Sequence, residues 1–198
     1  MYRQCVKRLL DIIIATMGLV VLSPVFVVLA ILIKKDDGGP IFFAQDRVGL
    51  HKKPFRLYKF RSMRVTAPAN CPTEELDNPD FWITKTGTWM RKTSLDELPQ
   101  ILNIIRGDMS IVGPRPVVLA EEELITYRER YGANDIRPGL TGWAQINGRD
   151  EVGTKRKAIL DGEYVLRMSF LFDVRIFLAT FIDVIQEKGI HEGRRDEE

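Results

Sequence analysis

One uninterrupted apolar run near the N-terminus constrains this chain more than any other feature. Residues 12–33 read IIIATMGLVVLSPVFVVLAILI and contain no charged side chain. A straight helix over this run would be about 33 Å long at ~1.5 Å per residue, which is enough to cross the core of a bilayer. The run is too long for the apolar part of a signal peptide, and no small-residue cleavage site follows it. The sequence therefore predicts a membrane-embedded segment.

Two details indicate how the run lies in a membrane. Pro24 stands in its middle, where proline kinks or breaks a helix, and the hydroxyl of Ser23 can bond a carbonyl that the break frees. Basic residues flank the run at both ends: Arg3, Lys7 and Arg8 before it, Lys34 and Lys35 after it. Since basic flanks favour the cytoplasmic side, both ends are expected there. These residues leave two topologies open, a re-entrant hairpin bent at Ser23-Pro24 and a spanning helix.

The rest of the chain has the composition of an ordinary folded domain. Of the 198 residues, 45% are hydrophobic and 28% are charged, which excludes collagen-like and disordered classes. A net charge of +2 gives no indication of a nucleic-acid partner. The distant cysteines Cys5 and Cys71 favour a reducing compartment, and two histidines supply too little for a zinc site or a histidine base. We expect a membrane segment over residues 1–35 and one cytoplasmic domain over 36–198.

Strands and loops can be placed coarsely. Residues 40–48 and 55–63 are predicted to be short strands, joined by the turn residues 49–54 into a β-hairpin. The polar, proline-containing stretch 70–81 is interpreted as a surface excursion. The stretch 134–148 is dense in Gly, Pro and Asn, which predicts a structured loop.

Helices account for most of the remainder. Residues 99–106 predict a helix, because Pro99 suits its first position and Gly107 its C-terminal cap. A second, acid-rich helix is predicted over 117–131. Together with the hairpin, these elements indicate an α+β fold that is rich in helix.

The segment 164–185 is apolar but not free of charge. Four charged residues interrupt it: Arg167, Asp173, Arg175 and Asp183. Four charges disfavour a transmembrane helix. Two interpretations remain: an amphipathic helix lying in the membrane interface, or a core helix of the domain. The charged tail 192–198 is predicted to be frayed.

Two adjacent acids, Asp96 and Glu97, are the strongest candidates for catalysis. A capping box would have Ser94 as the N-cap with Glu97 reaching back. That interpretation would place Pro99 inside the helix, where a backbone donor is required. If the helix instead begins at Pro99, the two carboxylates lie just ahead of it and make a plausible metal and phosphate site.

Three arginines supply counter-charge for such a site. Arg91 lies five residues before the first acid, and Arg115 is held between two prolines in GPRP. Arg137 belongs to the glycine-rich segment IRPGLTGWAQING. With the carboxylates, these arginines describe a site for a phosphate ester and a divalent cation such as Mg²⁺. There is no Walker loop and no dinucleotide fingerprint in the sequence.

A basic stripe begins at the end of the first predicted strand and runs through the second. The segment from Arg47 to Arg64 contains seven Lys or Arg residues and no acid, interleaved with aromatic residues. Nucleic acid is one partner for such a stripe, and a solvated strand face is the plainest interpretation. Beside a membrane segment with basic flanks, anionic lipid headgroups are the better partner.

Several long motifs in order resemble a known family. These are KRLLDIIIA, the central Ser23-Pro24 pair, YKFRSM at 58–63, TSLDELPQ at 93–100, GDMSIVGPRP at 107–116 and RPGLTGWAQINGR at 137–149. Together they resemble the small monotopic phosphoglycosyl transferases, the minimal bacterial sugar transferases that begin glycoconjugate and polysaccharide assembly. The resemblance covers nearly the whole chain.

The resemblance implies an activity, a cofactor and a location. Members of this family transfer a sugar 1-phosphate from a UDP-sugar to undecaprenyl phosphate and release UMP, with a requirement for Mg²⁺. It implies a monotopic protein on the cytoplasmic face of the cell inner membrane, whose re-entrant helix is broken at Ser23 and Pro24. It assigns the catalytic dyad, and with it the metal, to Asp96 and Glu97.

The resemblance also implies a covalent mechanism. Asp96 would attack the β-phosphorus of the UDP-sugar and form a phosphoaspartyl-sugar intermediate, since an ionised carboxylate needs no separate base. The lipid phosphate would then attack this intermediate, with Glu97 assisting or holding the metal. Arg91, Arg115 and Arg137 are candidates for binding the substrate phosphates.

Two alternative functions remain open at this point. One is a membrane-anchored, non-enzymatic adaptor that binds anionic lipid, and the other is a lipid transferase that acts by single displacement. The sequence does not indicate which UDP-sugar or glycan pathway is involved, or whether the protein is a homo-oligomer. Residues 65–89 are a candidate for sugar selection without an assigned role.

Overall fold

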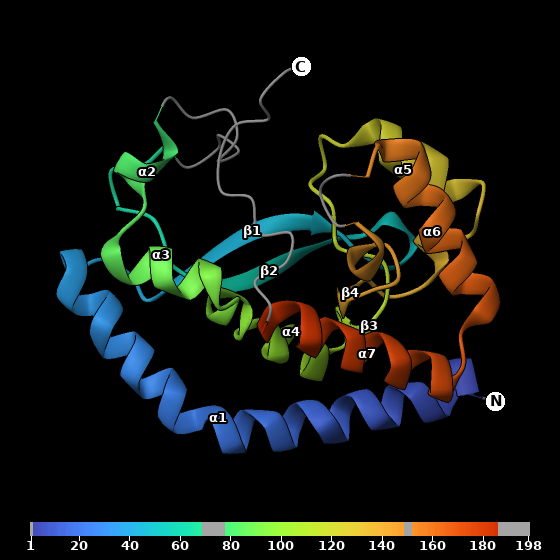
Figure 1. The fold of residues 1–198 in the computed structure, drawn as a ribbon, viewed down its shortest axis with the longest axis horizontal. Coiled ribbons are helices and arrows are strands. Elements are labelled where there is room, and N and C mark those ends of the chain that lie inside the picture. Colours follow the sequence, from blue (N-terminus) through green and yellow to red (C-terminus); the bar gives the residue numbers. More distant parts are fainter. Residues whose placement is uncertain (1, 69–77, 149–151, 186–198) are drawn as a thin grey trace.

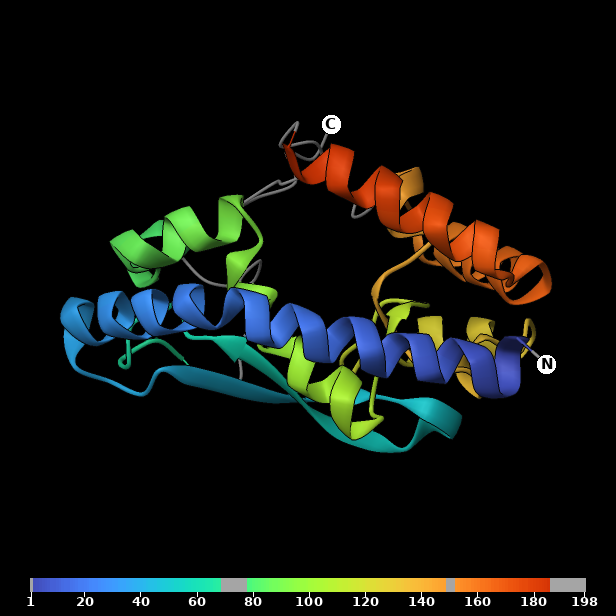
Figure 2. The same ribbon diagram turned by 90° about the horizontal axis from the view of Figure 1, so that it is seen from below.

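The computed structural model describes residues 2–68, 78–148 and 152–185, which form an α+β, helix-rich fold beside one long helix (Figure 1). A π-helical turn at Tyr2–Val6 leads into that helix, α1 (Lys7–Asp37). Figure 2 shows α1 running the length of the molecule, and by length and composition α1 could cross a membrane. The predicted tail 192–198 and residues 70–77 of the expected excursion lie outside the described residues.

Pro24 lies inside α1 without ending it. Its nitrogen cannot donate to the carbonyl of Val20 four residues earlier, and the Ser23 hydroxyl donates to that same carbonyl at 2.8 Å. The helix bends in its middle and continues to Asp37 (Figure 1). The Ser23-Pro24 pair therefore accompanies a bend, as expected, but the two halves do not fold back as the antiparallel arms of a hairpin.

Only a narrow stripe of α1 packs on the domain. Ala15, Leu29 and Ile33 are buried, whereas apolar residues on the other sides are exposed, with Val21 at 73%. Asp11 is also buried, and its carboxylate accepts hydrogen bonds from the Ser110 hydroxyl and the Ile111 amide at 2.8 and 3.1 Å. A buried carboxylate with such partners fixes the rotation of the helix against the domain.

The predicted hairpin is confirmed, with shifted ends. Strands β1 (Phe42–Val48) and β2 (Pro54–Phe60) pair antiparallel, with Phe42 opposite Phe60. The second strand ends earlier than expected, because Arg61 turns its guanidinium onto the carboxylate of Asp37 at the end of α1.

Three short helices and a turn follow the hairpin. Helices α2 (Pro79–Trp82) and α3 (Lys85–Lys92) precede a 3-10 turn (Leu95–Glu97), which leads into α4 (Gln100–Arg106). The predicted helix at 99–106 is thus confirmed, with Gly107 as its C-terminal cap at φ 101°. Side chains of α4 form a core with α1 and β2 that contains Ala15, Leu57 and Ile101.

A second sheet was not predicted. Strands β3 (Ser110–Val112) and β4 (Gly139–Thr141) pair in parallel. The composition of 134–148 predicted only a loop. Strand β4 has three residues, which are too few to show a strand pattern in the sequence. Helix α5 (Glu122–Glu129) begins five residues later than predicted, because the backbone of Val117 and Val118 pairs with β1 instead.

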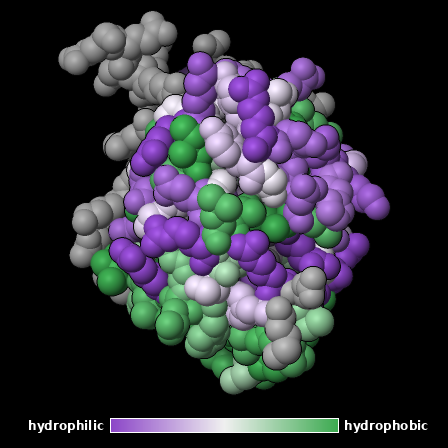
Figure 3. Space-filling view, turned by 90° about the vertical axis from the view of Figure 1, so that its right-hand side faces the viewer, coloured by the Kyte–Doolittle hydropathy of each residue, from purple (hydrophilic) through white to green (hydrophobic). Residues whose placement is uncertain are grey.

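The segment 164–185 is divided between two C-terminal helices, and the second of them packs on the domain core along one face. Helix α6 (Thr154–Arg167) ends before α7 (Phe170–Ile185) begins, and α7 buries Phe172 and Ile176 against β3 and α6. The opposite face of α7 is apolar and exposed, with Leu171 at 78%. Figure 3 shows apolar side chains gathered along the bottom of the view, the side on which α1 and α7 lie in Figure 1, and polar side chains over most of the rest of that face.

Candidate active site

Asp96 and Glu97 lie on the turn between α3 and α4. Ser94 begins this turn with a left-handed backbone (φ 54°), and its carbonyl accepts a hydrogen bond from the Glu97 amide at 3.2 Å. The Ser94 side chain makes no capping hydrogen bond, and α4 begins only after Pro99. The capping box is therefore not formed, which leaves both carboxylates available to other partners.

Two cations from separate elements meet these carboxylates. Lys59 on β2 places its Nζ 2.9 Å from Oε1 of Glu97 and 3.9 Å from Oδ2 of Asp96. Arg115 places Nη2 at 3.2 Å from the same Glu97 oxygen. Asp96 is 7% exposed, so its charge is compensated largely by the neighbouring protein groups.

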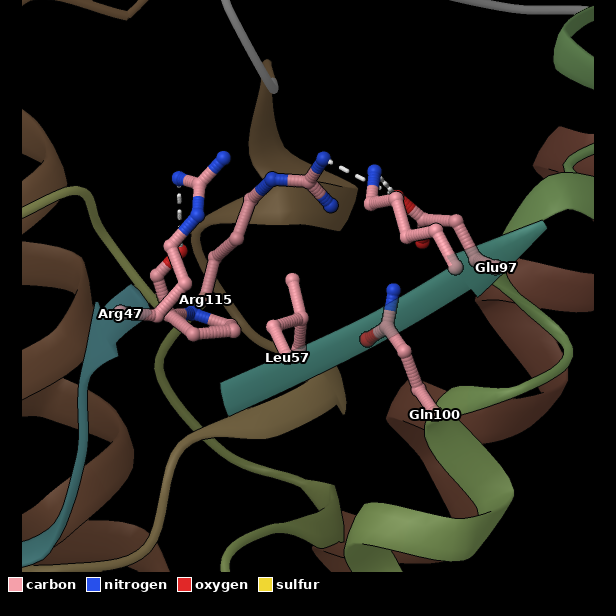
Figure 4. A pocket seen from close by; sticks show the side chains of 7 residues that line it. Arg47, Leu57, Glu97, Gln100 and Arg115 are labelled. Atoms are coloured by element: carbon pink, nitrogen blue, oxygen red, sulfur yellow. Dashed lines mark hydrogen bonds and ion pairs between the residues drawn. The ribbon is translucent and has the colours of Figure 1, made fainter. Parts of the chain in front are cut away.

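A polar hollow opens beside Glu97. About 220 Å³ of atom-free space lies in and above it, and this figure includes open solvent. Figure 4 shows the guanidinium group of Arg115 between that of Arg47 on one side and Glu97 on the other. The lining residues are Arg47, Leu57, Lys59, Glu97, Gln100, Arg115 and Pro116. Three cationic side chains around one carboxylate make a hollow suited to an anionic ligand with several phosphate oxygens.

Arg115 is mounted firmly by its backbone. The Pro114 carbonyl accepts from the Gly139 amide at 2.9 Å, and the Arg115 carbonyl accepts from Nη1 of Arg128 at 3.0 Å. Arg128 is itself buried and ion-paired with Asp161 at 2.7 Å. The prolines and this buried pair hold the GPRP segment beside the hollow, as the sequence led us to expect.

The other two predicted arginines occupy different places. Arg91 donates from Nε to the Ser62 hydroxyl at 3.0 Å and is close enough to Asp96 to act on its charge. Arg137 lies at the opposite end of α4, where its Nε donates to the Gly107 carbonyl at 2.8 Å. The structure therefore brings Arg91 and Arg115 to the acid pair and places Arg137 elsewhere.

The electrostatics of Asp96 reflect two opposing influences. Burial raises the pKa of Asp96 above its usual range, and the adjacent Glu97 carboxylate raises it further. Lys59, Arg91 and Arg115 act in the opposite direction and lower this pKa. The ionised form of Asp96 thus depends on the cations around it.

Sequence reasoning missed Lys59 and Arg47 as residues of this site. The basic stripe that contains them is not one surface: Arg61 binds Asp37, and Arg56 pairs with Asp46 at 3.6 Å. The alternation of β2, which places Leu57 and Lys59 on one face, is the signal that could have found Lys59. No local signal assigns Arg47, because its neighbour Arg115 is distant in sequence.

The described residues contain no group of three or more His, Cys, Asp or Glu side chains that could hold a metal ion. Asp96 and Glu97 therefore offer two carboxylates and no complete protein cage. This donor set fits the usual mode of Mg²⁺, which takes one or two carboxylates and completes its shell with substrate phosphates and water.

Comparison with known proteins gives a family for this architecture. The family model for bacterial sugar transferases matches residues 2–187, which include α1, both acids and every residue that lines the hollow. The chain belongs to the bacterial sugar transferase family.

Particular relatives are similar over most of the chain. It is 41% identical over 193 residues to the uncharacterized sugar transferase EpsL of Bacillus subtilis (strain 168), covering 94% of this chain and 90% of EpsL. It is 42% identical over 188 residues to the UDP-glucose:undecaprenyl-phosphate glucose-1-phosphate transferase of Escherichia coli (strain K12). That match covers 90% of this chain but 40% of the longer relative. The exopolysaccharide production protein ExoY of Rhizobium meliloti (strain 1021) is 37% identical over 197 residues, 92% of this chain and 87% of ExoY.

Proposed function

We propose that this protein transfers a sugar 1-phosphate from a UDP-sugar to undecaprenyl phosphate and releases UMP. The observation that carries the proposal is the pairing of Asp96 and Glu97 with Lys59 and Arg115 at the edge of a cationic hollow. Family membership and the named activity of the Escherichia coli relative support the same reaction.

Asp96 is the proposed nucleophile. One of its carboxylate oxygens forms a bond to the β-phosphorus, while the bond from that phosphorus to the bridging oxygen breaks and UMP leaves with the electron pair. An oxygen of the lipid phosphate then forms a bond to the same phosphorus and displaces the Asp96 carboxylate. The product is undecaprenyl diphosphate carrying the sugar, and the enzyme is regenerated.

The surrounding residues support both displacements. Lys59 lies close to both acids, so it favours the ionised nucleophile and offsets the charge of an incoming phosphate. Arg115 and Lys59 both contact Glu97, which fixes the position of that carboxylate. Asp96 and Glu97 would hold a Mg²⁺ ion, which when bound neutralises charge on the diphosphate and on the leaving nucleotide.

We infer a monotopic location on the cytoplasmic face of the inner membrane, and the exposed apolar surfaces support the association with a membrane. Most of α1 is apolar and exposed, and the exposed side of α7 adds Leu171, Phe177 and Phe181. These surfaces lie on the same side of the molecule, the lower side in Figures 1 and 3. A re-entrant α1, bent near Ser23-Pro24 with both basic flanks on the cytoplasmic side, would let the site meet a soluble donor and a membrane-bound acceptor.

The test is turnover with a panel of UDP-sugars in vesicles that contain undecaprenyl phosphate. We expect UMP release and a sugar-diphosphate lipid with at least one donor, and loss of both when Mg²⁺ is chelated. A folded, vesicle-bound protein that releases no UMP with any donor would contradict the proposal and favour the adaptor. Undecaprenyl phosphate is the only acceptor supplied, so product formation also tests the acceptor.

A further inference from the structure

Arg47 differs from two buried arginines, Arg61 and Arg128, in that it has no carboxylate partner within the part of the chain that the structure describes. Arg61 binds the carboxylate of Asp37, and Arg128 binds that of Asp161. Arg47 on β1 is half-buried, and no carboxylate of the described residues lies within ion-pairing distance of its guanidinium. A guanidinium that is partly withdrawn from water usually has a carboxylate partner, so its absence from the described surroundings of Arg47 points to a ligand.

The hydrogen bonds of Arg47 are also incomplete. Nη2 donates to Oε1 of Gln45 at 2.8 Å, while Nη1 reaches the Pro116 carbonyl only at 3.4 Å. Nε is buried and has no hydrogen-bond partner among the described residues. Burial lowers the pKa of Arg47 and the positive charge of Arg115 lowers it further, whereas the more distant carboxylates of Glu121 and Glu97 raise it. An anion in the hollow would offset the repulsion between the two arginines.

The charges around the hollow are ordered in space. Nζ of Lys59 and Nη2 of Arg115 lie 2.9 and 3.2 Å from Oε1 of Glu97, which neighbours the nucleophile in sequence. Arg115 therefore lies between Glu97 and Arg47, and Figure 4 shows this order. In an in-line displacement the leaving group departs on the side opposite to the nucleophile. The end of the hollow that holds Arg47 suits that departing group.

We propose that Arg47, together with Arg115, binds the phosphate that leaves with the nucleotide. This leaving-group subsite is separate from the side of Lys59 and Asp96, where the phosphorus exchanges its bonds. The inference rests on the proposed function, since it assumes a diphosphate donor that is attacked by Asp96.

Binding measured without turnover isolates the subsite. In an Asp96→Asn background, calorimetry in lipid nanodiscs would compare UMP with uridine, with and without Arg47→Gln. We expect Arg47→Gln to raise the Kd for UMP about tenfold or more, because a charge-assisted contact is lost. The Kd for uridine should not change, because uridine carries no phosphate. Arg56→Gln is the matched control, since Arg56 is an exposed arginine of the same hairpin that does not line the hollow.

Steady-state kinetics with Asp96 intact supply the second readout. We expect Arg47→Gln to raise the KM for the UDP-sugar and to leave the KM for undecaprenyl phosphate unchanged. A rise in the acceptor KM alone, with UMP binding unchanged, would overturn the inference and assign Arg47 to the lipid phosphate. If Arg47→Gln does not fold, Arg47→Lys replaces it. This variant keeps the positive charge but loses the planar guanidinium that binds a phosphate through two nitrogens, so we expect it to weaken UMP binding too.

The outcomes separate this inference from the proposed function. Unchanged UMP affinity in the folded Arg47 variants, with normal turnover by the unsubstituted protein, would overturn the subsite and leave the proposed function intact. Absence of UMP release by the unsubstituted protein would overturn both.

Discussion

At one end of α4 the turn Leu95–Glu97 presents two carboxylates to Lys59 and Arg115, and at the other end two arginines bind backbone carbonyls. Arg8 donates to the carbonyls of Ile104 and Ile105 at 2.7 and 3.0 Å, and Arg137 donates to that of Gly107 at 2.8 Å. The last carbonyls of a helix lack intrahelical partners, and cationic side chains there are stabilising.

The two ends use the same kind of side chain for different purposes. At the C-terminal end each guanidinium satisfies backbone groups, so its role is to hold α1 and the Arg137 loop on the domain. At the other end the cations face carboxylates and an open hollow, so a ligand with negative charge can join them. We infer that the chemistry is confined to the end with the acids, and the following predictions test that division.

The largest effect is expected at the nucleophile. Asp96→Asn should lower UMP release by at least about 10³-fold, because the amide cannot form the acyl phosphate intermediate. The variant should remain folded, since Asn is nearly isosteric and removes a carboxylate whose pKa is raised by burial. Initial rates and circular dichroism would check both points. Substantial residual activity would favour single displacement.

Arg115 should matter for activity far more than for stability. Arg115→Gln is expected to lower kcat/KM by about 10²-fold, because it removes a charge-assisted contact at the hollow and one of the two cations that contact Glu97 there. Its guanidinium is partly exposed, so the thermal midpoint should hardly change. A large drop in the thermal midpoint with unchanged kcat/KM would show that Arg115 has a structural role. That result would contradict the proposed division between the two ends of α4.

The pH dependence of the first step should report on Lys59. The nucleophile must be ionised, and the folded protein raises the pKa of Asp96, so UMP release should fall on acidification at a higher pH than for an ordinary aspartate. Lys59 lowers that pKa, and Lys59→Gln should therefore move the acidic limb to still higher pH. Rates of UMP release between pH 4 and 9 would be compared, and an unshifted limb would contradict the assigned role.

The smallest effect on catalysis is expected at the other end of α4. Arg137→Gln should lower the free energy of unfolding by about 1 kcal/mol, because it weakens the contact to the Gly107 carbonyl. The KM for the UDP-sugar should stay unchanged. Thermal unfolding in detergent and steady-state kinetics would measure both, and a selective rise in KM would place Arg137 in the substrate site after all.

Local patterns predicted much of this molecule. The long apolar segment, the hairpin and the helix after Pro99 follow from periodicity and turn residues, and the acid pair stands out because Pro99 conflicts with a capping box. The mounting of Arg115 also follows, since its flanking prolines act locally.

The remaining features depend on contacts between distant segments. Arg91, Arg115 and Arg137 look alike in sequence, and only the packing of α4 shows that Arg137 lies away from the acids. Lys59 reaches Glu97 because β2 packs beside the turn, and the β3–β4 pair joins two segments that are too short to show a strand pattern. Such pairings are set by tertiary contacts that local propensity does not encode.

The central claim is that Asp96 forms a covalent bond to the sugar phosphate at the acidic end of α4. Intact-mass spectrometry and UMP quantification, with Mg²⁺ and UDP-glucose or another UDP-sugar but no lipid acceptor, test it directly. We predict one sugar-phosphate adduct for each UMP released, mapped to Asp96 and absent from Asp96→Asn. Turnover that begins only when undecaprenyl phosphate is added, with no adduct at any time, would contradict the claim and establish direct transfer.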